Sequence, residues 1–545
     1  MKYLIFVLLL FSGCEKLSVQ AGTVYHISPS GSNSNSGTIT SPWQTLSYAC
    51  SRATATGDEI HVTAGIYTES SMSNLAVGVS VTGEVGSIIR STITTQYSYV
   101  LSLSSGSNTN GNQRVSGLKF ISATPYAAFA AVRVVYRNNV EITNCEFTEF
   151  NYHAISLENG QQSVNFATGN KIHDCVITNC AAYIGTYPSG DSKGSVNIDS
   201  QNGLLIYNNT ITVDRPDGKN GNCIDAVQGF LKNVKVYNNT FTKVYKPGTW
   251  DFAIEYWNLY EGNEIYNNEI TGSVDICRAW GGSPYCVWVH DNRIGQNSLI
   301  GSQSIRGVLL EITHRDVIIE RNFIKNVASG VFVNLGYTTN QQTNVRISYN
   351  IFYNIGALVN STGWGVYYSI EQTEDRQQTV IDNVIINNNV FIGSSNSSYT
   401  TRYGIGLPDA GKATNVSVRN NIITNFDSYA IYGNGRDGTT IDNMVIERNI
   451  GYGNGNNNII FTEGLSPTNS TISSNIMLNP LFVSSTDFHL QAGSPAINTG
   501  RYVNLTIDYD NKTVADPPEI GCYEFGSSHS TLGKIITSNG KLIKK

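Results

Sequence analysis

Charged side chains recur at the third position of short, mostly apolar trios along the middle of the chain. The trios are Asn197-Ile198-Asp199, Cys223-Ile224-Asp225, Ala253-Ile254-Glu255, Ile276-Cys277-Arg278 and Leu309-Leu310-Glu311, and polar trios ending in Ser156, Asn334 and Ser369 extend the series on both sides. Strand side chains alternate between the two faces, so an inward middle residue leaves the third residue outward. We therefore expect one outward row that contains these five charged residues.

The spacing of the acids within this row suits glycoside hydrolysis. Neighbouring strands lie about 4.8 Å apart, so Asp225 and Glu255 approach the roughly 5–5.5 Å between the carboxyl groups of retaining glycosidases. Glu255 and Glu311 would lie two strands apart, at about 9.6 Å, near the upper end of the roughly 6.5–9.5 Å range of inverting glycosidases. We therefore name Asp225, Glu255, Arg278 and Glu311 as catalytic candidates.

A second chemistry stays open for the same row. A polysaccharide lyase abstracts a proton beside a uronate carboxylate and needs a base and a cation that stabilises the developing charge. Arg278 between two acids would serve, and Asp199 and Asp225 would offer hard oxygen ligands to Ca²⁺. His314, just beyond Glu311, keeps another base available. A solenoid that only binds carbohydrate, without a catalytic pair, is the third possibility.

Aromatic residues gather beside the row. Four of the six Trp residues fall between positions 250 and 288. We expect Tyr256, Trp257 and Trp280 to contact sugar rings, because such sites are lined by aromatic side chains with a few polar groups. Glu371 lies in the longest insertion of the repeat, and insertions in repeat proteins often lie on the binding face. With His314, these residues complete the predicted substrate-binding set.

A repeated strand–turn unit must position all these side chains. Segments such as Ile206-Tyr207-Asn208-Asn209 return every 24 to 39 residues. Their shared position holds Cys145, Cys175, Asn209, Asn239, Asn268, Asn292, Asn322, Asn350, Asn389, Asn421, Asn449 and Asn475. The units have strand periodicity and no long helical stretch lies between them. Repeats of this length indicate stacked coils, and identical Asn side chains can hydrogen-bond along such a stack.

The pattern resembles the right-handed parallel β-helix of the pectate-lyase type over roughly residues 90 to 480. Tyr25-His26-Ile27-Ser28-Pro29 and Pro42-Trp43-Gln44-Thr45-Leu46 resemble the entry region of bacterial β-helix polysaccharide-degrading enzymes, including family 9 polysaccharide lyases. The resemblance implies an all-β fold of about a dozen coils. Family 9 lyases use a lysine base and clustered calcium-binding aspartates. The predicted row has no Lys and no Asp-Asp pair, so no residue is transferred from that family.

Five segments are expected along the chain. Residues 1–22 resemble a bacterial lipoprotein signal and tether, with Cys14 as the lipidated residue, and an ordinary cleaved signal is the alternative. Residues 23–90 form the N-terminal cap and first coils, with Thr45 capping a helix from Leu46 to Ala53. The β-helix then spans 91–480, a C-terminal cap spans 481–526, and a hairpin around Asn539-Gly540 spans 527–545.

Composition limits the partners and the location. The net charge of −6 and the isoelectric point near 5.8 argue against binding to nucleic acid. We expect an exported monomer that meets an extracellular polysaccharide, either anchored by lipid to the outer membrane or cell surface or secreted. Eight Cys remain besides Cys14. Cys145 and Cys175 share the repeated position, where either a disulfide or buried thiols would fit.

Overall fold

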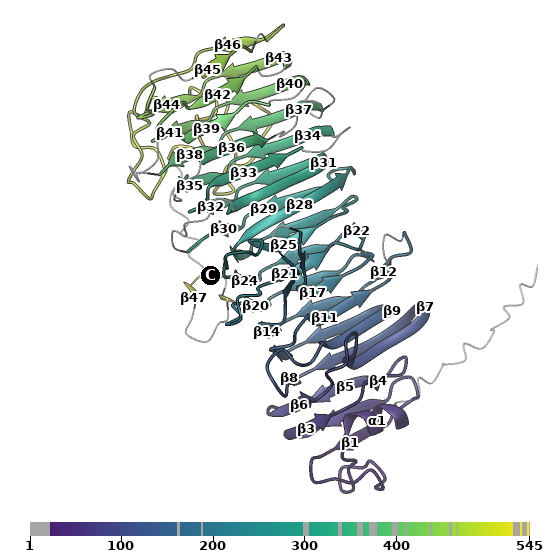
Figure 1. Cartoon of the computed structure of the whole chain (residues 1–545). Coiled ribbons are helices and arrows are strands. Elements are labelled where there is room, and N and C mark those ends of the chain that lie inside the picture. Colours follow the sequence, from purple (N-terminus) through teal and green to yellow (C-terminus); the bar gives the residue numbers. More distant parts are fainter. Residues whose placement is uncertain are drawn as a thin grey trace, which may run out of the picture.

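A computed structural model shows a long stack of parallel β-coils (Figure 1). It describes residues 22–526, together with 535–536 and 542–543. Within the first range, the structure leaves out 161–163, 187–188, 298–304, 336–340, 357–362, 370–378, 395–401, 409–410, 436–438, 457–459 and 466. The predicted signal, with Cys14, lies outside the described residues. The prediction of a parallel β-helix is confirmed.

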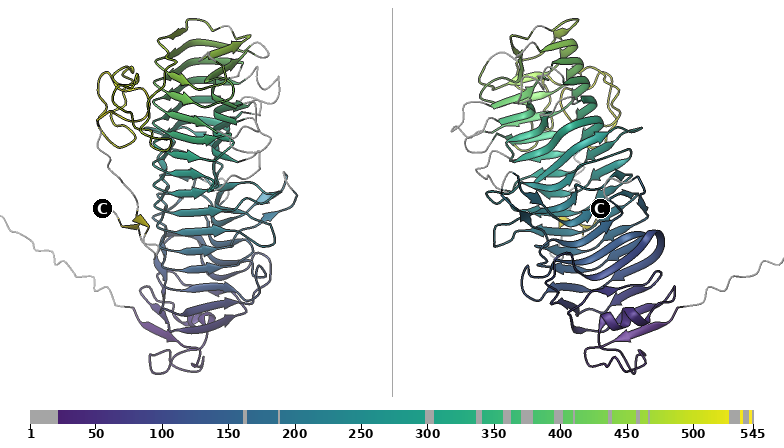
Figure 2. Two further views of the ribbon diagram at one scale, coloured as in Figure 1. Left: turned by 90° about the vertical axis from the view of Figure 1, so that its left-hand side faces the viewer. Right: turned by 45° about the vertical axis from the view of Figure 1, so that its right-hand side comes forward.

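Three parallel sheets run the length of the stack (Figure 2). The first sheet comprises β4 (Ser73–Asn74), β7 (Tyr99–Ser116), β9 (Ala130–Thr143), β11 (His153–Glu158), β17 (Gly194–Ile198), β21 (Asn222–Ala226), β25 (Phe252–Tyr256), β28 (Ser273–Trp280), β31 (Arg306–Glu320), β33 (Ser329–Asn334), β36 (Gly363–Ser369), β39 (Arg402–Gly406), β42 (Ile431–Asn434) and β45 (Ile460–Glu463). This sheet carries the predicted row.

The second sheet follows the first in each coil, and the long strands β7, β9 and β31 belong to both. It comprises these three together with β1 (Val24–Ile27), β2 (Glu59–Val62), β5 (Ser80–Gly83), β13 (Lys171–His173), β19 (Leu205–Tyr207), β23 (Lys235–Tyr237), β26 (Asn263–Tyr266), β29 (Val287–His290), β34 (Gln341–Ser348), β37 (Val380–Asn387), β40 (Lys412–Arg419), β43 (Thr440–Glu447) and β46 (Thr471–Ser473).

The third sheet closes each coil. It comprises β3 (Gly65–Glu69), β6 (Ser87–Ser91), β8 (Lys119–Ser122), β10 (Glu146–Thr148), β14 (Val176–Thr178), β20 (Thr210–Val213), β24 (Thr240–Lys243), β27 (Glu269–Thr271), β30 (Arg293–Gly295), β32 (Phe323–Lys325), β35 (Ile351–Ile355), β38 (Val390–Gly393), β41 (Ile422–Thr424) and β44 (Ile450–Tyr452). Short pairings beside the sheets involve β12 (Ala167–Thr168), β18 (Gln201–Asn202) and β22 (Leu231–Lys232), and separately β15 (Tyr183–Ile184) and β16 (Asp191–Ser192). Near the end of the chain, β47 (Ile535–Ile536) pairs antiparallel with β48 (Leu542–Ile543), as the predicted hairpin requires.

The repeated Asn lies at the turn between the second and third sheets and forms the expected ladder. Nδ2 of Asn209 donates to Oδ1 of Asn239 at 2.9 Å, and Nδ2 of Asn239 donates to Oδ1 of Asn268 at 3.0 Å. The left-handed residue of the turn is the one before the ladder position, for example Asn208 with φ 56°. One residue therefore makes the turn, and the next bonds to the neighbouring coils.

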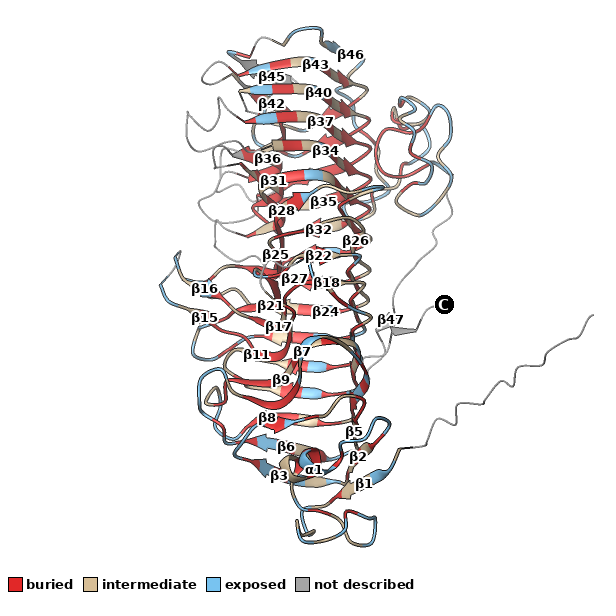
Figure 3. Ribbon diagram, turned by 90° about the vertical axis from the view of Figure 1, so that its right-hand side faces the viewer, coloured by how far each residue is buried: buried red, intermediate tan, exposed pale blue. Residues whose placement is uncertain are grey.

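Inward side chains of the three sheets form a continuous apolar core (Figure 3). Aliphatic residues align from coil to coil, as Ile206 aligns with Val236 and Val236 with Ile265. Phe352 and Phe391 also stack inside, with ring centroids 4.5 Å apart. Stacked coils therefore bury apolar surface that a single coil cannot bury alone.

The N-terminal end is covered by α1 (Leu46–Arg52), the predicted helix. Backbone N of Tyr48 donates to Oγ1 of Thr45, which caps the helix. Leu46, Ala49 and Cys50 are buried on the face that was predicted from their spacing. The described part of the chain contains no helix with the length and apolar character needed to cross a bilayer.

The segment after β46 packs along the flank of the stack, as Figure 2 shows. It covers outward apolar residues of β35, β38, β41 and β44, namely Ile351, Val390, Ile422 and Ile450. Phe488, Leu490, Ile520 and Tyr523 supply the opposing surface. The predicted C-terminal cap, residues 481–526, therefore lies against the outside of the third sheet. We call residues 479–525 the C-terminal clasp.

Candidate functional site

Three carboxyl groups occupy successive positions of one outward column on the first sheet. Asp225 of β21 lies opposite Glu255 of β25, and Glu255 lies opposite Asp275 of β28. Asn197 precedes the three and Leu309 follows them in the same register. The predicted neighbourhood of Asp225 and Glu255 is thus correct. Asp275 is a site residue that the trios missed.

The predicted place of Asp199 is wrong. Asn197, two residues earlier, is the partner of Asp225, and Asp199 follows the end of β17. Val196 and Ile198 both face inward, so the apolar pattern alone does not show which of them aligns with Ile224 of the next strand. Burial and then the charge of Glu158 raise the pKa of Asp199 to about 7. Asp199 and Asp225 therefore do not form the predicted pair of metal ligands on adjacent strands.

The predicted place of Arg278 is also wrong. The strand pairing shifts between Ile276 and Arg278, and Arg278 lies opposite Thr313. Its guanidinium carbon lies 5.3 Å from the ring centroid of Trp257, a cation–π contact. Arg278 therefore sits beside the carboxyl column, and Asp275 takes the position that was assigned to it.

Cys277 links the column to Glu311. Its thiol donates to Oδ2 of Asp275 at 3.4 Å and to Oε2 of Glu311 at 3.7 Å. Glu311 lies opposite Asn334 on β33, as predicted. The four acids thus form one cluster across four strands, although Glu311 is offset by two residues from the column of the other three.

Two neutral donors fix the carboxyl group of Glu255. Nε1 of Trp257 donates to Oε1 at 2.8 Å, and Nδ2 of Asn222 donates to Oε2 at 2.6 Å. The amide of Asn222 is oriented in turn by Ser192, whose Oγ donates to its Oδ1 at 2.8 Å. Both oxygens of Glu255 are therefore held as acceptors, which favours the ionised form.

Burial of the carboxyl groups in the cluster favours their protonated forms. Asp225 and Asp275 are 2% and 1% exposed, and no Lys or Arg among the described residues forms an ion pair with any of the four acids. Burial first, and then the charge of Glu255, raises the pKa of Asp225 well above its usual range. Burial likewise raises the pKa of Asp275, and raises that of Glu255 to about 7. Neighbouring buried carboxyl groups cannot all ionise near neutral pH.

The predicted substrate-binding residues divide into three groups. Tyr256 is 1% exposed and His314 is fully buried, and both side chains point into the core. Burial lowers the pKa of His314 to about 4, and its Nε2 lies 3.1 Å from the carbonyl oxygen of Ile276. These two predictions are therefore wrong. Trp257 and Trp280 lie at the surface near the cluster, and Trp280 is 44% exposed. Glu371 lies outside the described residues.

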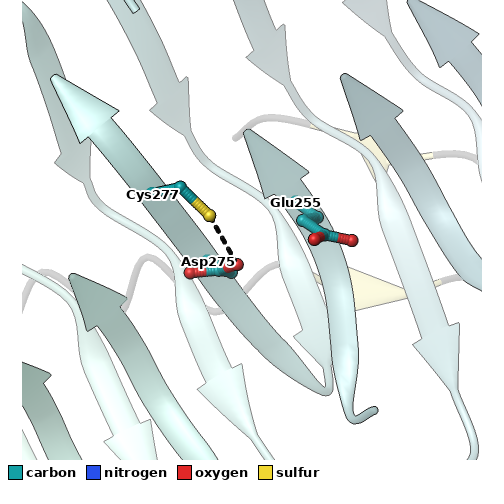
Figure 4. Close-up of side chains that lie close together, drawn as sticks. All are labelled: Glu255, Asp275 and Cys277. Atoms are coloured by element: carbon teal, nitrogen blue, oxygen red, sulfur yellow. Dashed lines mark hydrogen bonds between the residues drawn. The ribbon is translucent and has the colours of Figure 1, made fainter. Parts of the chain in front are cut away.

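Part of the cluster could hold a cation (Figure 4). One donor atom each from Glu255, Asp275 and Cys277 lie within 4.8 Å of one another. Oδ1 of Asp275 has no hydrogen-bond partner although it is buried. Ca²⁺ prefers an all-oxygen shell, whereas a thiol beside carboxylates suits Zn²⁺ better. The donor set therefore fits a borderline metal such as Zn²⁺ more closely than Ca²⁺.

The sequence contains a signal for Asp275, which the trios missed. Val274-Asp275-Ile276 alternates apolar and acidic residues just as Ile254-Glu255-Tyr256 does. The trio centred on Cys277, two residues later, fits the same pattern and predicts Arg278 in the row instead of Asp275. Asn222 and Ser192 carried no comparable signal, because their contacts to the cluster depend on how separate segments pack.

No protein family model matches the chain, and no curated protein matches its sequence. Among solved structures, a tailspike protein variant of E. coli bacteriophage HK620 in complex with pentasaccharide is similar at 12% identity and a TM-score of 0.51, over 78% of this chain and 73% of the tailspike. A rhamnogalacturonan lyase matches at 13% identity and a TM-score of 0.31, over 69% and 84% of the two chains. The pectate lyase Pel9A matches at 12% identity and a TM-score of 0.31, over 93% and 97%.

These likenesses concern the fold. The strand pairings and the likeness to the tailspike define the class: the chain is a parallel β-helix protein. Many unrelated activities share a fold of this kind. Function must therefore be argued from the carboxyl cluster.

Proposed function

We propose that the chain hydrolyses an extracellular polysaccharide at the carboxyl cluster of the first sheet. The observation that carries the proposal is the in-register column of Asp225, Glu255 and Asp275 on adjacent strands. Glycoside hydrolysis needs two carboxyl groups with different protonation. The tailspike with a similar fold was solved with a pentasaccharide, and the same class of ligand is proposed for this chain.

In this proposal Glu255 is the ionised member of the pair. Trp257 and Asn222 donate to both of its oxygens, so it is held ready to act as nucleophile or base. A protonated neighbour, Asp225 or Asp275, then gives a proton to the oxygen of the leaving sugar. A carboxylate oxygen of Glu255 lies within 4.8 Å of one of Asp275. This spacing favours the retaining course, in which the two carboxyl groups lie about 5–5.5 Å apart.

Replacing single carboxyl groups tests the proposal. Glu255→Gln and Asp225→Asn should each lower the release of reducing ends from a cleaved polysaccharide by at least ~100-fold, the scale of general acid–base catalysis. Glu269→Gln is the matched control, because Glu269 lies on β27 of the third sheet and pairs with Arg293 at the surface. Full turnover by Glu255→Gln would contradict the proposal. Retention of a polysaccharide without release of reducing ends would favour a binding solenoid.

A cation-assisted lyase is the second candidate, and the cluster of Glu255, Asp275 and Cys277 favours it. In that reaction the residues would hold the cation that stabilises charge beside a uronate carboxylate. Products of a lyase absorb ultraviolet light because they contain a new double bond. The lyase reaction is supported if a uronate polymer yields this absorbance and EDTA abolishes it. Adding back Ca²⁺ or Zn²⁺ then shows which cation restores the activity. Hydrolysis that EDTA leaves unchanged excludes it.

The location is part of the same proposal. A lipid on Cys14 would tether the β-helix to the outer membrane or cell surface, because one acyl chain with a second acyl group gives stable anchoring. Detergent phase partition of the protein made in cells tests this. Native protein should enter the detergent phase, and Cys14→Ala should stay in the aqueous phase. Aqueous partition of both proteins would indicate secretion.

A further inference from the structure

The column that carries the acids continues as aromatic residues in the next coils. Asp275 lies opposite Leu309, Leu309 opposite Phe332, and Phe332 opposite Tyr367. On the following strands, Trp364 lies opposite Tyr403 and Gly406 opposite Tyr432. We call Phe332, Trp364, Tyr367, Tyr403 and Tyr432 the aromatic strip. The strip and the acids thus share one face of the first sheet.

The rings of the strip pack against one another and are preformed. The ring centroid of Trp364 lies 4.6 Å from that of Tyr367 and 4.2 Å from that of Tyr403. The ring centroids of Tyr403 and Tyr432 are 4.8 Å apart. Gly406 makes room for the indole, since a Cβ there would lie 3.1 Å from Cζ3 of Trp364. A bound ligand would therefore meet rings that are already ordered, which lowers the entropic cost of binding.

From Trp364 onward the strip is uncharged in the part that the structure describes, whereas the guanidinium carbon of Arg306 lies 4.4 Å from the ring centroid of Phe332. Strands β33, β36 and β42 contain no acidic or basic residue. Arg402, in β39, is 1% exposed and its guanidinium is directed to Asp427 and to the carbonyl oxygen of Ser394. The face thus changes from carboxyl groups at Asp275, past the cation of Arg306 over Phe332, to uncharged rings from Trp364 onward. A charged uronate chain would find no counter-charge along these later rings.

We propose that the aromatic strip binds a neutral stretch of the same glycan that enters the carboxyl cluster. The proposal rests on the proposed function and deepens it. Tyr and Trp rings offer apolar contact to the C–H groups of sugars, and phenol hydroxyls hydrogen-bond to sugar hydroxyls. From Glu255 to Tyr367 there are four strand steps, roughly 19 Å at the ordinary strand spacing. The ligand is therefore a chain of several uncharged sugars lying along the β-helix axis.

Binding is tested in full-length Glu255→Gln, so that turnover does not consume the probe. Soluble neutral polysaccharides and uronate polymers are compared by affinity electrophoresis in native gels. Tyr403→Ala and Tyr367→Ala should each weaken retention by a neutral polysaccharide about 10-fold, which is equivalent to about 1.4 kcal/mol for the contacts of one ring. Tyr403→Phe should weaken it less. Tyr452→Ala on β44 of the third sheet, 42% exposed, is the matched control.

Three outcomes would overturn the proposal that the aromatic strip binds a neutral glycan. The first is that Tyr403→Ala is retained as strongly as the control, and the second is that uronate polymers retain the protein more tightly than neutral polysaccharides do. The third outcome is that no polysaccharide retains the protein. A shift from dimer to monomer caused by Tyr403→Ala would mean that a second copy covers the strip, which also overturns it. Melting temperatures confirm that each variant is folded. The proposed function fails separately, if Glu255→Gln keeps turnover while Tyr403→Ala still weakens binding.

Discussion

Nε1 of Trp257 donates a 2.8 Å hydrogen bond to Oε1 of Glu255, two residues earlier at the end of β25. The indole therefore stabilises the ionised carboxylate within a buried cluster that disfavours it.

Trp257→Phe keeps an aromatic ring but removes this donor. Loss of a hydrogen bond to the charged form should raise the pKa of Glu255 from about 7 by about one unit. The acidic limb of the profile of kcat/KM against pH should move upward by the same amount. Trp280→Phe is the control, because its Nε1 donates to Asn258 instead. An unmoved limb in Trp257→Phe would show that Glu255 is not the group that titrates in catalysis.

The ladder makes a second prediction that does not depend on function. Nδ2 of Asn239 donates to Oδ1 of Asn268 and to the carbonyl oxygen of Ile206, and its own Oδ1 accepts from Asn209. Asn239→Ala should lower the free energy of unfolding by about 3 kcal/mol or more, because buried polar groups lose their partners. Urea unfolding measures this loss.

Asn238→Gly is the matched variant for the ladder. Asn238 has φ 56°, a left-handed conformation that glycine adopts without strain. The change should alter the free energy of unfolding by less than about 1 kcal/mol. Equal losses for Asn238→Gly and Asn239→Ala would contradict the division of labour between the two positions.

The C-terminal clasp should weaken as pH rises. Burial and the neighbouring Glu519 raise the pKa of Glu524 to about 8, from the ordinary 4.5. Between these two values the folded chain binds a proton that the unfolded chain has released, so stability falls as pH increases. Asp487 and Asp510 both contact His489, and they raise its pKa above 6.5. The stabilisation that protonated His489 provides is fully present below pH 6.5 and is lost as the pH rises through the raised pKa.

Glu524→Gln imitates the protonated side chain. In this variant the free energy of unfolding should fall less between pH 5 and pH 8, by about 1 kcal/mol or more, than in the native protein. Hydrogen exchange of Ile422 and Ile450, which the clasp covers, reports its release in the native chain. The control is Glu269→Gln, because the carboxyl group of Glu269 lies at the surface. The slope of unfolding free energy against pH is compared between the two variants. Identical slopes would show that Glu524 does not control the clasp.

The cysteines provide a prediction about redox state. All eight Cys of the described residues are free and buried, including Cys145 and Cys175 at adjacent ladder positions. Burial raises the pKa of Cys145 to about 12, so the thiolate that reacts is scarce. A thiol reagent should label none of these eight in the native protein and all of them after denaturation. A melting temperature that falls on reduction would instead indicate a disulfide.

The periodic sequence was enough to predict the architecture. Asn recurs at the same turn in ten of the twelve ladder positions, so the strands and their stacking followed from the repeat. The helix after Thr45 followed from its own cap and apolar spacing. The site was predicted only in part. Asp225, Glu255 and Glu311 lie in the cluster, but Asp199 and Arg278 were misplaced, because an apolar residue two positions away fits an alternating strand equally well. Tyr256 and His314 were assigned to the surface although they alternate inward.

The C-terminal clasp has a consequence for how the stack comes apart. A solenoid whose coils contact only their neighbours can fray one coil at a time from its end. The clasp instead contacts β35, β38, β41 and β44 together. These four coils cannot open singly until the clasp has peeled away. We therefore expect the C-terminal end to unfold as one cooperative block, and to resist pulling forces as a unit.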